Sequence, residues 1–214
     1  DAMLAVSLRV IVRAVFGVVE AERMGPWTAA ITALVHGFSP LVLFFPALQR
    51  APFGLGPWAR FLRARDGLDD LLLAEIRGRR SSGARGEDIL SMMLDASHED
   101  GRSMSDVELR DELVTLLFAG HETTQIAMSW MLYHVANDRV AADRLLAELD
   151  ASDGSPEALA KLPYLDAVVN ETLRLNPIVP DFIRTLVVPM TLGGHELPAG
   201  SHVAMVSSLV HTRP

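Results

Sequence analysis

A short run of small and polar residues interrupts an apolar stretch near the middle of the chain. The run covers residues 119–124 and reads AGHETT. Ala119, Gly120 and Thr123 share one face of a helix, because residues one, three and four apart are neighbours there. We call this face low, because alanine and glycine have little or no side chain, and a flat or small ligand could therefore approach the backbone. Glu122 points elsewhere, into an expected buried setting, where a carboxylate is costly unless it is paired or protonated.

A glycine in the middle of a helix lowers stability by about 0.5–1 kcal/mol relative to alanine. A run that keeps such a residue is expected to have a functional role. One alternative is a helix kink, in which a hydroxyl bonds back to the preceding turn. A zinc site is a weaker alternative. His121 and Glu122 begin the HExxH pattern, but Gln125 stands where the second histidine would be.

A second group of residues that could pair is Glu171 and Arg174, three apart in a predicted helix. The alternative is an ordinary surface salt bridge, but the apolar neighbours predict a substantially buried helix. Arg184 follows in the first predicted strand. A lone arginine is normally exposed, and a buried one would need an anion as partner.

These residues need a long central helix to position them. Ser105 and Glu108 form a predicted capping box, with serine as N-cap. From there the sequence predicts one helix to about residue 136, roughly 45 Å long and apolar all round at its middle, as in a helix that crosses the centre of a large protein. Other helices are predicted at 1–19, 27–36 after a break at 24–26, 58–80, 87–96, 138–149 and 165–175.

Short strands are predicted at 183–188, 191–192 and 202–206, with turns between them. The fold class is therefore mainly α, with a small β appendix near the C-terminus. We find no internal repeat and no inter-domain linker. The sequence thus predicts that residues 1–214 belong to a single domain.

The composition excludes several classes of protein. The chain has 214 residues, a net charge of −8 and 50% hydrophobic residues, which argues against a nucleic-acid-binding surface. There is no cysteine, so disulfides and cysteine metal sites are excluded. No apolar run reaches the roughly 18 residues of a membrane span, and we see no secretory signal. The exception to the acidic balance is a basic cluster predicted as a solvated loop: Arg77, Arg79, Arg80 and Arg85.

In order and spacing, these motifs resemble those of the cytochromes P-450. AGHETT resembles the family's oxygen-activation motif, [AG]-G-x-[DE]-T-[TS], and ETLR about 50 residues later matches its E-x-x-R. Each motif alone is weak, but together they are specific. The resemblance covers essentially the whole chain and implies part of the P-450 fold from helix E to just after helix K. The runs LLFAGHETT and VHTRP are similar to those of bacterial members. Further matches are Pro177, Arg184, the turn LGGHELPAG at 192–200 and VHTRP at 210–214.

The resemblance implies a haem b whose iron is held by a cysteine thiolate. Oxygen would face Ala119, Gly120 and Thr123. Thr123 would hydrogen-bond the oxygen and help deliver protons, and Glu122 would relay them from solvent. Arg184 would pair with a haem propionate. The implied activity is the oxidation of a small, lipophilic organic substrate by O2.

The resemblance also implies the surroundings of this chemistry. Glu171 and Arg174 would support the haem-binding core without reacting. Electrons would come from a ferredoxin or a flavoprotein reductase, and we expect a cytoplasmic protein without nucleic-acid partners. The expected substrate-lining residues are Leu116, Val179, Pro180 and Phe182, together with the segment 41–53.

The sequence departs from the family in one respect that matters for activity. The loop F-x-x-G-x-R-x-C-x-G, which carries the iron ligand, is absent, as is the helix that grips the other propionate. We therefore expect a fragment of a longer enzyme, inactive by itself. Two alternatives remain: a non-catalytic helical ligand-binding protein, in which Thr123 and Arg184 share no ligand, and a natural truncated product that acts in assembly or regulation.

Overall fold

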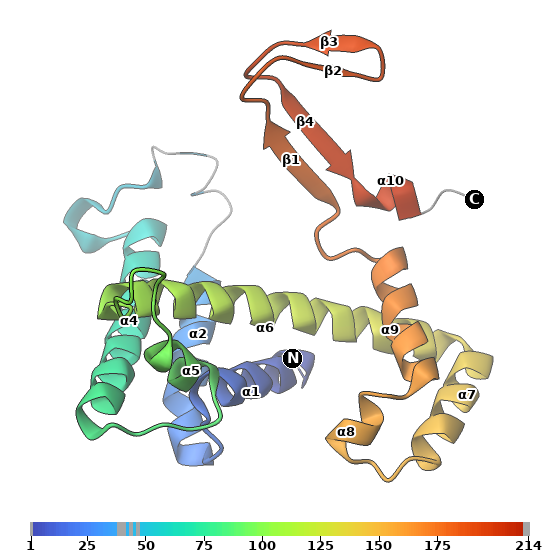
Figure 1. Cartoon of the computed structure of the whole chain (residues 1–214), viewed down its shortest axis with the longest axis horizontal. Helices are drawn as coiled ribbons and strands as arrows, with labels where there is room; N and C mark the ends of the chain where they lie inside the picture. The colour runs from blue at the N-terminus through green and yellow to red at the C-terminus, as the bar shows by residue number, and fades with distance from the viewer. Residues whose placement is uncertain (1, 38–41, 43–44, 46–47, 212–214) are drawn as a thin grey trace. The chain divides into compact units, whose positions relative to one another are not determined.

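The computed structural model is mainly helical and carries two small antiparallel sheets near its C-terminal end (Figure 1). It describes residues 2–37, 42, 45 and 48–211, so residues 41, 43–44 and 46–47 of the predicted substrate segment 41–53 lie outside the described residues. Two compact units divide the chain, Asp1–Glu122 and Thr123–Pro214. The predicted fold class is confirmed, whereas the single domain stays a prediction.

The first unit is built from helices. They are α1 (Ala2–Phe16), α2 (Ala21–Gly37), the short 3-10 helix η2 (Pro52–Gly54), α4 (Pro57–Ser82), α5 (Ile89–Asp95) and the first half of α6 (Asp106–Asn137). The predicted break at 24–26 is wrong, because α2 begins at Ala21 and contains Pro26. A proline there removes only the hydrogen bond to the Glu22 carbonyl, and Glu22 is exposed, so water can replace that bond.

Apolar side chains of α1, α2, α4, α5 and α6 form the core of the first unit. Residues four apart recur on the same helix face, which is the pattern of an amphipathic helix. The ring of Phe16 at the end of α1 stacks on Trp27 of α2, with centroids 3.9 Å apart. The described core residues without any exposed surface are Val12 and Val15 of α1, Val18 directly after it, Leu72 and Ile76 of α4, Leu90 of α5, and Leu109 and Leu113 of α6.

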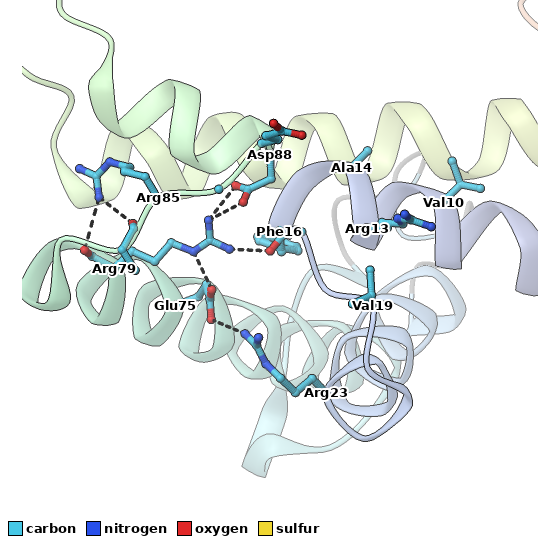
Figure 2. Close-up of a pocket in the computed structure, with 14 residues that line it drawn as sticks. Val10, Arg13, Ala14, Phe16, Val19, Arg23, Glu75, Arg79, Arg85 and Asp88 are labelled. Carbon is cyan, nitrogen blue, oxygen red and sulfur yellow. Dashed lines mark hydrogen bonds and ion pairs between the residues drawn. The ribbon is translucent and has the colours of Figure 1, made fainter. Parts of the chain in front are cut away.

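A buried ion pair ties the end of α1 to α4 and α5 (Figure 2). The guanidinium of Arg79 donates to both carboxylate oxygens of Asp88, at 2.7 and 2.8 Å, and to the carbonyl of Phe16 at 2.5 Å. Asp88 is also the N-cap of α5 and accepts from the Ser91 amide. The prediction of a solvated loop is therefore wrong for Arg77, Arg79 and Arg80, which lie within α4, and the side chain of Arg79 is only 12% exposed.

The central helix α6 starts at the predicted capping box. Ser105 Oγ accepts from the Glu108 amide at 3.2 Å, and the Glu108 carboxylate accepts from the Ser105 amide at 2.7 Å. Arg102 adds two hydrogen bonds to this carboxylate, which together with the Ser105 bonds lower the pKa of Glu108 well below its usual value. The helix that follows has 32 residues, as the sequence predicts to within a few residues.

The second unit holds the rest of α6 and every strand that the structure describes. Its helices are α7 (Arg139–Asp150), α8 (Pro156–Leu159), α9 (Pro163–Leu175) and α10 (Ser207–His211), and its strands are β1 (Asp181–Thr185), β2 (Met190–Leu192), β3 (His195–Leu197) and β4 (His202–Val206). Strand β1 pairs antiparallel with β4, and β2 with β3. Gly193 and Gly194 both have positive φ, which the tight β2–β3 turn requires.

Helix α9 begins without a side-chain cap of its own, because its N-cap is Leu162. Glu148 of α7 takes over this role: its two carboxylate oxygens accept from the amides of Tyr164 and Leu165, each at 2.9 Å. A carboxylate is favourable at a helix N-terminus, where unpaired amides point outward. Arg144 of α7 also lies over the Tyr164 ring, 4.1 Å from its centroid.

Two expectations about burial are wrong for the chain described here. Helix α6 is not buried on all sides, because Phe118, Trp130 and Tyr133 are 46%, 40% and 58% exposed. Helix α9 buries Thr172 among its residues, while its leucines and valines are exposed or half-buried. Both helices therefore present partly exposed apolar side chains.

No single helix in the described part of the chain is long and apolar enough to cross a membrane. Helices α1 and α2 reach that length and composition when taken together, with a bend of 108° between them.

Candidate functional site

The residues of the AGHETT run lie on different sides of α6. Four buried residues spaced four apart mark one side of the helix, and the last of them is His121. Since each residue turns an α-helix by about 100°, Ala119 and Thr123 both point about 160° away from His121. Ala119 is exposed and Thr123 is half-buried. The two residues therefore share a low face opposite the buried side, as predicted.

Gly120 allows close contact between two helices, whereas the sequence predicted that it opens the low face for a ligand. A Cβ atom added to it would lie 2.8 Å from Cδ1 and 3.6 Å from Cγ1 of Ile11 in α1. The missing side chain therefore admits helix α1. The expectation that Gly120 helps to open the low face for a ligand is wrong in this respect, because that side of Gly120 is occupied.

His121 is the buried residue of the motif, with 1% of its surface exposed. Burial lowers the pKa of its imidazole, and the nearby Glu122 carboxylate opposes this only in part. Its Nε2 atom has no hydrogen-bond partner among the described residues. The backbone carbonyl of His121 accepts a hydrogen bond from Ser7 Oγ at 2.5 Å.

Sequence reasoning did not identify His121 as a core residue, although its spacing from the apolar stripe was the available signal. Within the described ranges, no group of three histidine, cysteine, aspartate or glutamate residues could hold a metal ion.

Glu122 is exposed, so the expectation of a buried carboxylate is wrong. It follows His121 by one residue and therefore points about 100° around the helix from the buried stripe. Its carboxylate is therefore open to solvent. An acid relay by Glu122 consequently needs no pairing partner to offset burial.

The predicted pairing of Glu171 with Arg174 is confirmed. Arg174 donates from Nε and Nη2 to the two carboxylate oxygens, each at 2.7 Å, and these bonds lower the pKa of Glu171. Both side chains are about half exposed, which contradicts the expected burial. Arg174 Nη1 also donates to the carbonyl of His211 at 2.5 Å and so links α9 to α10.

Arg184 lies in β1, opposite Val203 of β4, and is exposed. Its guanidinium donates to the carbonyl of the neighbouring Ile183 at 3.0 Å. Being exposed, it does not require an anion, but its remaining N–H groups are accessible to one. Of the predicted substrate-lining residues, Leu116 is half-buried in α6, and Val179, Pro180 and Phe182 are exposed near the start of β1.

Comparisons with known proteins agree with the resemblance. The sequence model of the family "Cytochrome P450" matches residues 1–214. A Mycobacterium tuberculosis protein called cytochrome P450 135B1 is 37% identical over 213 residues, covering 98% of this chain and 44% of the relative. Lanosterol 14-alpha demethylase of Rattus norvegicus is 33% identical over 183 residues, covering 83% of this chain and 35% of the relative.

Solved structures share the fold. Cyanobacterial CYP120A1 with bound retinoic acid matches with a TM-score of 0.81 and 27% identity, over 99% of this chain and 47% of that one. The heme domain of cytochrome P450DA matches with a TM-score of 0.81 over 100% of this chain and 48% of that one; its 23% identity supports the fold alone. The chain thus spans about half the length of the proteins that it matches.

Proposed function

Because this chain belongs to the cytochrome P450 family, whose members use haem b, we propose that it provides the oxygen-facing half of a haem-dependent monooxygenase. The observation that carries the proposal is the low face of α6 formed by Ala119 and Thr123. It lies opposite the buried stripe that ends at His121. In this proposal residues 1–214 form one part of a single enzyme domain.

Two features of the chain, each taken within its own unit, support the proposal of a haem group. Ala119 and Thr123 offer a low, accessible surface for a flat macrocycle, and the exposed Arg184 offers free N–H donors for a propionate. Gly120 does not contribute open space, because Ile11 fills it. When bound, haem supplies the iron centre that activates O2, and its cysteine ligand would come from sequence outside this cysteine-free chain.

The chain's own residues would handle protons. Monooxygenation consumes O2, two electrons and two protons, places one oxygen atom in the substrate and releases the other as water. The Thr123 hydroxyl can both donate and accept a hydrogen bond, so it can hold oxygen in place and pass on a proton. The exposed Glu122 carboxylate would take that proton from solvent, and a water molecule would bridge the turn of the helix to Thr123.

Charged residues of the second unit would bind a haem propionate or support the residue that binds it. Arg184 would bind a propionate in a charge-assisted pair. Glu171 and Arg174 have a structural role in this proposal: Arg174 fixes α10 to α9, and α10 directly follows β4, the strand paired with the one that carries Arg184.

We further propose a lipophilic substrate. The rat relative is named for lanosterol, and the solved cyanobacterial neighbour holds retinoic acid; both are largely apolar molecules. Leu116, Val179, Pro180 and Phe182 would contribute apolar surface to the substrate site. The electron donor would be a ferredoxin or a flavoprotein reductase in the cytoplasm.

A chimera tests this function. Residues 1–214 would replace the matching segment of cytochrome P450 135B1, which supplies the remaining sequence of a family member. With a reductase and a panel of fatty acids and sterols, Thr123→Ala should raise the share of electrons lost as hydrogen peroxide, because proton delivery fails. Thr124→Ala, at the exposed neighbour, is the matched control. Equal peroxide release from both variants would argue against a proton-handling role for Thr123.

A further inference from the structure

Helix α1 contacts α6 directly at the AGHETT turn. Ser7 and Ile11 lie four residues apart and therefore share one face of α1. Ser7 Oγ donates to the His121 carbonyl at 2.5 Å, and Ile11 occupies the space in front of Gly120. Two adjacent residues of α6 thus meet two residues on one face of α1.

The two contacts constrain α6 in different ways. The hydrogen bond fixes the position of α6 along α1, because the donor and the acceptor are each a single atom. Ser7 and His121 are both 1% exposed, so water does not compete for this bond. The Ile11 contact fixes the separation of the helices, because a side chain at position 120 would not fit while Ile11 keeps its place.

Helix α1 is itself firmly held. Val12 and Val15 on its inner face are fully buried. At its C-terminal end, the Phe16 carbonyl accepts from Arg79, which the Asp88 carboxylate holds in place (Figure 2). A helix anchored by its core face and by its end can transmit a defined position to the helix beside it.

We propose that Ser7 and Ile11 are positioning residues that set the place of the Ala119–Thr123 turn of α6. The importance of this turn for oxygen chemistry rests on the proposed function, whereas the contact itself does not. Ser7 and Ile11 would not touch oxygen or substrate. They would act through the backbone of Gly120 and His121.

The test uses the full chain and needs no haem. The position of the turn is read from the NMR signal of the Ala119 methyl group, and its opening from hydrogen exchange of the backbone amides at 121–125. Ser7→Ala should shift the Ala119 signal and speed exchange at these amides roughly fivefold, the equilibrium effect of one ordinary hydrogen bond. Gly120→Ala should also shift the Ala119 signal, because the new Cβ displaces Ile11 or α6.

Rescue separates positioning from a loss of stability. Ile11→Val removes Cδ1, the atom nearest to the added Cβ, so Gly120→Ala with Ile11→Val should return the Ala119 signal to that of Ile11→Val alone. Ser129→Ala removes a hydroxyl that bonds within α6 itself, to the Gln125 carbonyl at 2.8 Å, and Leu94→Ala weakens the core in α5; neither should move the signal.

The proposal is overturned if Ser7→Ala leaves Ala119 unmoved, if Leu94→Ala moves it equally, or if the double variant shows no rescue. Because no haem is present, these outcomes are independent of whether the chimera performs oxygen chemistry. A shifted Ala119 signal together with an inactive chimera would refute the proposed function but not the contact.

Discussion

The buried carboxylate of Asp88 should be worth several kilocalories per mole to the fold. Its surface is 3% exposed, and it accepts two hydrogen bonds from Arg79 and one from the Ser91 amide at 2.9 Å. Asp88→Asn keeps a good N-cap but removes the charge opposite Arg79. Asp88→Ala removes both, so the pair of variants separates the two effects.

The magnitude follows from what each variant leaves behind. Breaking a buried ion pair costs about 3–5 kcal/mol. Arg79 keeps Glu75 as a partner at 2.8 Å, so we expect the lower end, about 3 kcal/mol, for Asp88→Asn. Loss of the cap adds about 1 kcal/mol in Asp88→Ala. Ser105→Ala removes an exposed N-cap without an arginine partner and should cost about 1 kcal/mol, which makes it the control.

Urea unfolding followed by circular dichroism measures these free energies. Acid adds a second readout. Burial raises the pKa of Asp88, but the bonds from Arg79 and Ser91 outweigh it and hold the pKa below its ordinary value. The carboxylate therefore contributes stability above about pH 4, which is lost as the pH falls through the folded-state pKa. Asp88→Asn should lack this acid-sensitive part. A cost for Asp88→Asn no larger than that of Ser105→Ala would refute the reasoning.

Three further outcomes are expected. Burial lowers the pKa of His121, so the unfolded chain binds a proton more readily than the folded chain. The free energy of unfolding should therefore fall as the pH drops below about 6.5, and His121→Leu should remove this part of its pH dependence. Glu148→Ala should cost about 1–2 kcal/mol, because α9 loses the acceptor for two amides, whereas Glu148→Gln should retain part of the cap, as judged by urea unfolding. Glu171→Gln should leave the thermal midpoint of the chain unchanged, since the pair with Arg174 is solvent-exposed; a clear fall would show that the pair supports the isolated fold.

Local signals made part of the structure predictable from sequence. The capping box at Ser105 fixes where α6 begins, and Asn176-Pro177 stops α9, because both depend on residues close in the chain. The break expected at Pro26 failed, because packing of α2 outweighs one lost backbone hydrogen bond. Strand β3 and helix α10 were missed, since three and five residues carry too little pattern.

The candidate site was predictable in its motif but not in its orientation. The sequence places Ala119 and Thr123 on one face, because helical spacing alone decides this. That Gly120 faces Ile11, that His121 is buried and that Glu122 is exposed all depend on where α1 lies, and this contact joins residues more than 100 positions apart. Spacing within α6 does not contain that information.

The central claim is that this chain supplies the oxygen-facing half of a haem-thiolate enzyme. The most direct test is the reduced, CO-treated absorption spectrum of the chimera with cytochrome P450 135B1. We expect the Soret band of a thiolate-ligated haem, retained in Thr123→Ala, because Thr123 handles protons and does not ligate iron. A soluble chimera that binds haem but lacks this band, while cytochrome P450 135B1 itself shows it, would contradict the account.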